Sequence, residues 1–129
     1  MPFKFHGGVH PNYMKAPDVP VTVIAPPPQV VLPVMQHIGA PCKPLVEVGD
    51  YVKMGQKIGE NPAPVSAPVH ASVSGKVVAI EPRPHPLGDM IMSIVIENDY
   101  QDTPCDDLKP LTEEELKDPE AILERIRQA

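Results

Sequence analysis

Short apolar runs separated by glycine and proline fill the chain between residues 29 and 98. Runs that alternate apolar and polar residues, or that are apolar over about four to eight positions, are typical of β-strands. In chain order the runs are residues 29–33, 45–48, 51–54, 57–60, 72–73, 76–81 and 90–97. Turn signals recur at roughly six- to twelve-residue intervals, which favours a sandwich or barrel over strand–helix–strand units.

The chain before this region, residues 1–28, is predicted to be an extended arm. Prolines at 11, 17, 20 and 26–28 keep the backbone in extended or polyproline conformations. Residues 19–24 alternate enough to form a short strand within the arm. The arm is either a strap that covers a sheet edge, which we favour, or a docking arm for a partner.

The chain after this region, residues 99–129, is predicted to be an acidic linker followed by a short helix. Thr112 and Glu115 have the spacing of a capping box. Asp118 is a suitable N-cap, and Pro119 suits the first helical turn. The helix has one apolar stripe, formed by Ile122, Leu123 and Ile126. A helix this short is marginal alone, so the stripe needs a surface to pack on.

Composition narrows the possible classes of function. Nineteen of the 129 residues are proline, which disfavours long helices. The net charge of −6 does not suit a nucleic-acid-binding protein. We expect neither a membrane span nor a secretory signal, because no sufficiently long apolar run occurs. Cys42 and Cys105 lie far apart in sequence, which suits free thiols in a reducing compartment, although a disulfide stays open.

The most informative segment, residues 46–58, has the pattern V-x-x-G-D-x-V-x-x-G-Q-x-I. Gly49 and Gly55 can adopt a positive φ, and Asp50 can cap a turn through its carboxylate. The two apolar residues inside the pattern are expected to point into the core: Val52 and Ile58.

This pattern resembles the biotinyl and lipoyl carrier domains, and residues 67–77 resemble the second half of the same fold. The resemblance implies an all-β barrel-sandwich hybrid over residues 29–98. Carriers hold their modified lysine on the hairpin between the two halves, but residues 60–66 contain no lysine. Lys53 lies before the hairpin, so we do not expect a swinging-arm function.

No catalytic, cofactor or metal site is predicted in this chain. The serines lie in turns, without the G-x-S-x-G pattern of a nucleophile elbow. His37, His70 and His85 could converge on a metal, but they lack close ligand spacing. The simpler interpretation is that His37 and His70 make hydrogen bonds in turns, while His85 lies in an exposed proline-rich hairpin. Arg83 lies between two prolines and could contact a partner or a phosphate.

Four motifs carry a more specific resemblance. They are F-H-G-G-V-H-P at 5–11, Q-H-I-G-A-P at 36–41, S-A-P-V-H-A-S-V-S-G at 66–75 and I-E-P-R-P-H-P-L-G at 80–88. Together, and in this order, they resemble the N-terminal domain of the RnfC family, the C subunit of the Rnf ion-translocating electron-transport complex. The resemblance covers essentially the whole chain.

This resemblance implies a subunit of a membrane-associated complex that moves electrons between ferredoxin and NAD and couples this to ion transport. The full-length subunit would carry FMN, NADH and two [4Fe-4S] clusters. The glycine-rich nucleotide segment and the C-x-x-C-x-x-C runs of the family are missing here. We therefore expect residues 99–129 to lead into a missing nucleotide-binding domain and this part to hold no redox centre.

The resulting hypothesis is a non-catalytic structural and docking domain. Its partners would be the other Rnf subunits and the rest of its own subunit, peripherally on the cytoplasmic side of the bacterial membrane. The candidate docking loops are residues 61–68 and 83–88, and the candidate docking residues are His70, Arg83 and His85. The alternatives are a lipoyl- or biotinyl-like carrier, a free-standing adaptor and an independent small enzyme.

Overall fold

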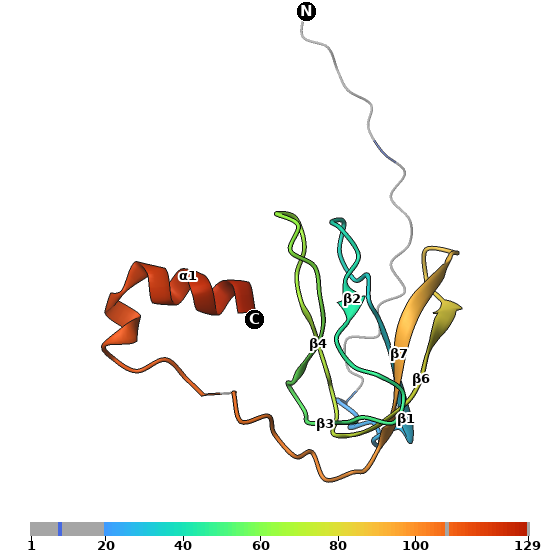
Figure 1. Ribbon diagram of the computed structural model, residues 1–129. Coiled ribbons are helices and arrows are strands. Elements are labelled where there is room, and N and C mark those ends of the chain that lie inside the picture. Colours follow the sequence, from blue (N-terminus) through green and yellow to red (C-terminus); the bar gives the residue numbers. More distant parts are fainter. Residues whose placement is uncertain (1–7, 9–19, 108, 129) are drawn as a thin grey trace, which may run out of the picture.

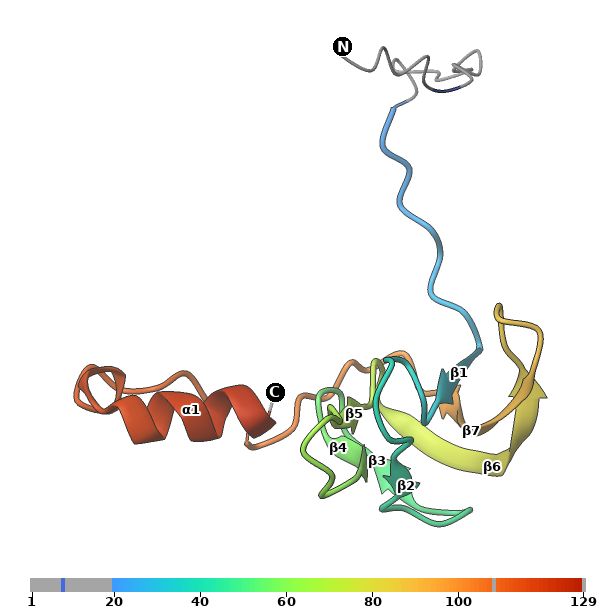
Figure 2. The same ribbon diagram turned by 90° about the horizontal axis from the view of Figure 1, so that it is seen from above.

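The computed structural model describes residues 8, 20–107 and 109–128 (Figure 1). The first of the four motifs lies outside these residues except for Gly8, and so does the arm before Pro20. The described chain forms a strand-rich barrel, an extended segment before it, and a tail that ends in a helix (Figures 1 and 2).

The larger sheet has four strands in the order β1–β7–β6–β3, all antiparallel. Its strands are β1 (Gln29–Pro33), β7 (Met90–Asn98), β6 (Gly75–Pro84) and β3 (Tyr51–Val52). β6 and β7 pair from Gly75 opposite Asn98 to Pro84 opposite Met90, which makes this hairpin the longest pairing of the fold. The sheet curls strongly around the core (Figure 2).

The smaller sheet has three strands in the order β2–β4–β5. They are β2 (Lys43–Pro44), β4 (Lys57–Glu60) and β5 (Val69–His70). Side chains from both sheets and from the turns between them form one small core. Its buried members are Val34, Cys42, Val46, Val52, Ile58, Val69, Ala71, Val77, Ile94 and Ile96.

The glycine-rich pattern folds as expected. Gly49 and Gly55 have φ values of +107° and +81°. The Asp50 carboxylate accepts a hydrogen bond from the Glu47 N–H at 2.8 Å. Val52 and Ile58 are fully buried, as predicted. Each turn therefore sends the chain back across the core with the next apolar residue pointing inward.

The expected strand at 45–48 was wrong. Leu45 and Val48 are more than half exposed, and the chain bends at this point. The Asp50 carboxylate accepts the hydrogen bond from the Glu47 N–H that a neighbouring strand would otherwise accept. Asp side chains compete with sheet pairing in this way. The short strand expected at 72–73 was also wrong, because β5 forms just before it. The runs at 29–33 and 57–60 match β1 and β4.

The segment before β1 is extended but is not a strand over its described residues 20–28. Val21 and Val23 are over 90% exposed, so this part does not form the strap that the sequence suggested. It leads away from the sheet (Figure 2). Its attachment begins at Pro27 and Pro28, whose carbonyls accept hydrogen bonds from the Asn98 side chain at 3.0 Å and the Asn98 N–H at 2.9 Å.

The tail ends in a 3₁₀ turn (Glu115–Lys117) and helix α1 (Pro119–Gln128). The Glu115 carboxylate accepts from the Thr112 N–H at 2.7 Å, and the Thr112 hydroxyl accepts from the Glu115 N–H at 3.3 Å, which confirms the capping box. The Asp118 carboxylate caps α1 by accepting the Glu120 N–H at 3.1 Å. The helix lies beside the barrel and leaves its apolar stripe largely uncovered (Figure 1).

We expect Gly75→Ala to destabilise the barrel far more than Gly49→Ala. Both residues have a positive φ, so either alanine adds backbone strain of about 1–2 kcal/mol. A Cβ at Gly75 would also collide with the Glu97 carbonyl of the neighbouring strand, whereas Gly49 opens to free space. Urea unfolding should show a loss of about 3 kcal/mol or more for Gly75→Ala. Equal losses in the two variants would contradict the close pairing of β6 and β7.

Candidate functional site

Three loops project from one end of the barrel, which we call the tip: residues 35–41, 61–68 and 84–90 (Figure 1). The first follows β1, the second joins β4 to β5, and the third is the turn of the β6–β7 hairpin. The Val34 N–H donates to the Met92 carbonyl at 3.0 Å, which places the first loop next to the hairpin. The Ala40 N–H donates to the Val65 carbonyl at 2.9 Å, which joins the first loop to the second.

The His37 side chain holds the first two loops together. Its Nδ1 accepts a hydrogen bond from the Gly39 N–H at 3.1 Å. A neutral imidazole has one donor and one acceptor nitrogen, so Nε2 carries the proton and donates to the Ala67 carbonyl at 3.3 Å. The opposite tautomer would satisfy only the Ala67 N–H, 3.1 Å from Nε2. The expectation that His37 makes hydrogen bonds in a turn is confirmed.

Further contacts make these two loops one rigid unit. Cys42 is buried and donates its thiol to the Ala67 carbonyl at 3.1 Å. The Ser66 hydroxyl donates to the Ala40 carbonyl at 3.1 Å. The Asn61 amide donates to the Pro41 carbonyl at 2.7 Å and accepts from the Ala63 N–H at 2.9 Å. The backbones approach so closely that a Cβ at Gly39 would run into the Val65 carbonyl.

The β6–β7 hairpin carries two of the three residues that the sequence singled out, Arg83 on β6 and His85 in the turn. The His85 backbone closes the turn, donating to the Asp89 carbonyl and accepting from the Gly88 N–H, both at 2.9 Å. Its Nδ1 accepts from the Leu87 N–H at 3.3 Å. The Arg83 guanidinium forms an ion pair with Glu81 at 2.6 Å on the same strand.

His70, the third of these residues, lies elsewhere. It belongs to β5 and lines a cleft of about 1060 Å³ between the barrel and α1. Lys57, Cys105 and Arg125 line the same cleft. The structure therefore brings Arg83 and His85 together on one hairpin and separates His70 from them. No periodicity in the sequence could reveal that the cleft exists, because its walls come from four separate segments between residues 55 and 128.

A polar network at the opposite end of the barrel fixes the start of the tail. The Tyr51 hydroxyl donates to Asp99 at 2.6 Å, and the Ser74 hydroxyl donates to the same carboxylate at 2.7 Å. The Ser74 oxygen also accepts from the Thr103 N–H at 2.9 Å. The Tyr51 hydroxyl is the main cause that lowers the pKa of Asp99, followed by the Ser74 hydroxyl and the Gln101 N–H.

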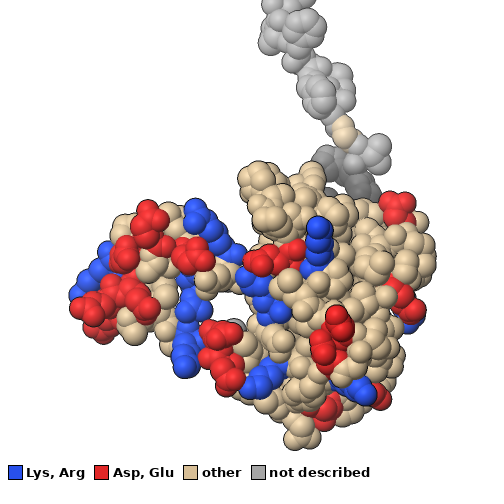
Figure 3. All heavy atoms as spheres, in the orientation of Figure 1, with Lys and Arg blue, Asp and Glu red and all other residues tan. Residues whose placement is uncertain are grey.

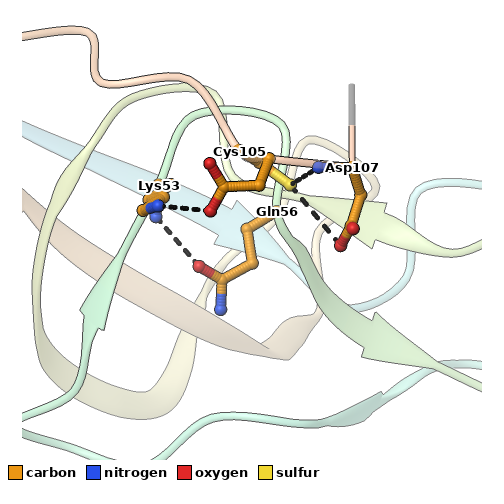
Figure 4. A network of polar contacts seen from close by, with 5 residues as sticks. Lys53, Gln56, Cys105 and Asp107 are labelled. Carbon is orange, nitrogen blue, oxygen red and sulfur yellow. Dashed lines mark hydrogen bonds and ion pairs between the residues drawn. The ribbon is translucent and has the colours of Figure 1, made fainter. Parts of the chain in front are cut away.

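A second network continues along the tail (Figure 4). Met54 donates its N–H to the Thr103 carbonyl at 2.9 Å and accepts from the Cys105 N–H at 2.8 Å. Lys53 forms an ion pair with Asp106 at 2.6 Å, and this contact raises the pKa of Lys53 and lowers that of Asp106. Residues 99–107, expected to be part of an acidic linker, are mostly exposed but lie along the barrel.

The donor set of this chain does not fit the [4Fe-4S] clusters that the resemblance implies for the full-length subunit. Each such cluster needs four cysteine thiolates, and the chain has two cysteines. Cys42 is buried at the tip and Cys105 lies in the tail. Over residues 20–107 and 109–128, no three His, Cys, Asp or Glu side chains gather as metal ligands would.

The two packed sheets and the paired glycine turns define the class as a barrel-sandwich hybrid domain. The hairpin that carries the modified lysine in carrier domains is replaced here by a proline-rich loop bound to its neighbour. The model of the family described as the RnfC barrel sandwich hybrid domain matches residues 3–101, and the chain belongs to that family. None of the helices in the described part is long and apolar enough to cross a membrane.

The chain is similar to proteins named as the C subunits of ion-translocating complexes. It is 48% identical over 127 residues to the C subunit of the "Na(+)-translocating ferredoxin:NAD(+) oxidoreductase complex" of Acetobacterium woodii, covering 97% of this chain and 29% of that protein. It is 48% identical over 100 residues to the "Proton-translocating" counterpart of Clostridium ljungdahlii, covering 76% and 22%. It is 39% identical over 129 residues to the C subunit of the "Ion-translocating oxidoreductase complex" of Vibrio cholerae, covering 97% and 17%.

These shares show that the chain spans less than a third of the length of the curated relatives it matches. The match falls in their N-terminal part.

We expect His37→Ala to lower the free energy of unfolding by about 1–2 kcal/mol, because two hydrogen bonds between the loops are lost. His85→Ala is the matched control and should cost about 0.5 kcal/mol or less, since it removes one long contact in an exposed turn. Urea unfolding measures both. Amide hydrogen exchange at Ala40 should accelerate in His37→Ala alone, and unchanged exchange there would contradict the role of His37.

We expect the stabilising effect of Tyr51 to depend on pH. A lowered folded-state pKa of Asp99 stabilises the fold above its ordinary value near 3.9, and this stabilisation is lost as the pH falls through the lowered pKa. The difference in Tm between the wild type and Tyr51→Phe should therefore be largest above about pH 5 and shrink below about pH 4. Tyr100→Phe, at an exposed position, serves as the control. A pH-independent difference would contradict the contact with Asp99.

Proposed function

We propose that this chain is the N-terminal structural and docking domain of the C subunit of an Rnf-type complex. The whole subunit would belong to a membrane-associated ferredoxin:NAD oxidoreductase that couples electron transfer to ion transport. The observation that carries the proposal is the family match over residues 3–101, together with relatives that are subunits of such complexes by name.

The division of labour within the subunit is part of the proposal. FMN, NADH and two [4Fe-4S] clusters would be bound by the parts of the subunit that the relatives have and this chain lacks. The cysteine content supports this, because Cys42 serves the packing of the tip and is buried there. The subunit would lie peripherally on the cytoplasmic side of the bacterial membrane and be held there by the other subunits.

The docking role is supported by the loops at the tip. Residues 61–68 and 83–88 project from the barrel on a framework fixed by hydrogen bonds. Arg83 and His85 would contact one neighbouring subunit from the hairpin. His70 faces the cleft beside α1, so it would contact the part of the subunit that fills this cleft. Preorganised loops lose little entropy on binding, which suits a docking element.

Deletion of residues 29–98 from the subunit in its native host tests the proposal. We expect the shortened subunit to keep NADH oxidation with the artificial acceptor ferricyanide within about twofold, because separate domains fold independently. We expect it to lose co-purification with the other subunits and ferredoxin-dependent NAD reduction. The ferricyanide assay also controls for misfolding of the remainder. A shortened subunit that still co-purifies with the other subunits would contradict the docking role. One that co-purifies but loses NADH oxidation would also contradict the proposal that this domain holds no redox centre.

A further inference from the structure

The tip combines exposed apolar side chains with almost no charge. Ile38 is 98% exposed, Leu87 76%, and Val65 and Met90 62% each. Charged residues make up 22% of the chain, yet Asp89 is the one formally charged residue in the three tip loops. The same end of the barrel is mostly uncharged in the space-filling view, whereas charges crowd the side that faces α1 (Figure 3).

The tip is also rigid. Each of its three loops contains proline: the prolines are Pro41, Pro62, Pro64, Pro68, Pro84 and Pro86. Proline fixes one backbone dihedral, so the loops lose less conformational freedom on binding. His37 and Asn61 tie the first two loops together, and the His85 backbone closes the third. Exposed apolar side chains on a fixed scaffold are typical of an interface.

We infer that the tip packs against an uncharged, apolar surface of another protein subunit of the complex. This inference rests on the proposed docking function and names the chemistry of the partner. Ile38, Val65, Leu87 and Met90 bury their side chains in the contact. The partner surface opposite these four side chains carries no charge, because a charge buried against them would lack sufficient hydrogen bonds, and Asp89 is the one opposite charge that the loops could offer.

The side chains favour a protein over a lipid surface as the occupant. Segments that bind membrane surfaces combine apolar residues with lysine or arginine, and often with tryptophan or tyrosine at the headgroups. The three tip loops contain none of these four residue types, and Arg83, which directly precedes the third loop, is already paired with Glu81. The chain as a whole carries a net charge of −6, which repels anionic lipids.

Three single substitutions test the inference in the complex purified from the native host through a tag on this subunit. Ile38→Asp and Leu87→Asp each place a carboxylate on the tip, on the first and the third loop respectively. Val48→Asp is the matched control, since Val48 is 61% exposed in the turn that precedes β3, away from the tip. We expect a loss of about tenfold or more in co-purified partner subunits for the two tip variants and no loss for the control. Equal recovery in all three, with unchanged Tm, overturns the inference.

A photocrosslinking amino acid at position 87, and in a second variant at position 48, identifies the occupant directly. We expect the adduct from position 87 to map, by mass spectrometry of the assembled complex, to an uncharged apolar segment of another subunit. An adduct with lipid, with a second copy of this chain or with a charged segment, or no adduct at all, overturns the inference. An adduct from position 48 alone refutes the assignment of the contact to the tip but is compatible with the proposed docking function. Intact assembly without residues 29–98 refutes both.

Discussion

The antiparallel pairing of β6 with β7 is the interaction on which the rest of the structure depends. Residues 93–96 of β7 are buried in succession, so this strand forms the centre of the fold rather than one face of it. β1 attaches to its free side, β3 attaches to β6, and Asn98 and Asp99 at its end hold the incoming and outgoing chain. The close approach at Gly75 allows the pairing to begin, and the hairpin turn at the other end becomes part of the tip.

The barrel separates two kinds of surface. Its tail side is rich in charge, with ion pairs and carboxylate hydrogen bonds such as Lys53 to Asp106 and Tyr51 to Asp99. Its tip is rich in proline and has Asp89 as its one formally charged residue. There the polar groups of His37, Ser66 and Asn61 are directed at the backbone of neighbouring loops. Polar side chains at the tip thus serve internal order, which leaves apolar atoms to face outward. One small core of valine and isoleucine supports both surfaces.

Part of the fold could be predicted from the sequence, because it depends on interactions between neighbouring residues. The glycine turns, the Asp50 cap and the inward Val52 and Ile58 each follow from a few neighbouring residues. The prediction of a strand at residues 45–48 failed, because the Asp50 carboxylate accepts the Glu47 N–H that a strand would use for pairing. The attachment of residues 99–107 was also missed, because acidic residues look solvated unless their partners on distant turns are known. The meeting of the tip loops depends on contacts across about twenty-five to thirty residues, which periodicity cannot show.

The position of Asn98 has a mechanical consequence. The chain enters the barrel at Pro27 and Pro28, and Asn98, the last residue of β7, bonds to both prolines. β1 and β7 are antiparallel and pair from Gln29 opposite Glu97. Once the contacts of residues 99–107 with the barrel are broken, a force that pulls the two flanking segments apart therefore loads the β1–β7 hydrogen bonds one after another, from this end inward. Under tension the β1–β7 hydrogen bonds therefore break one at a time rather than all together. The domain would yield at low force if the segments on either side were drawn in opposite directions, and it is best placed where both are anchored on the same body.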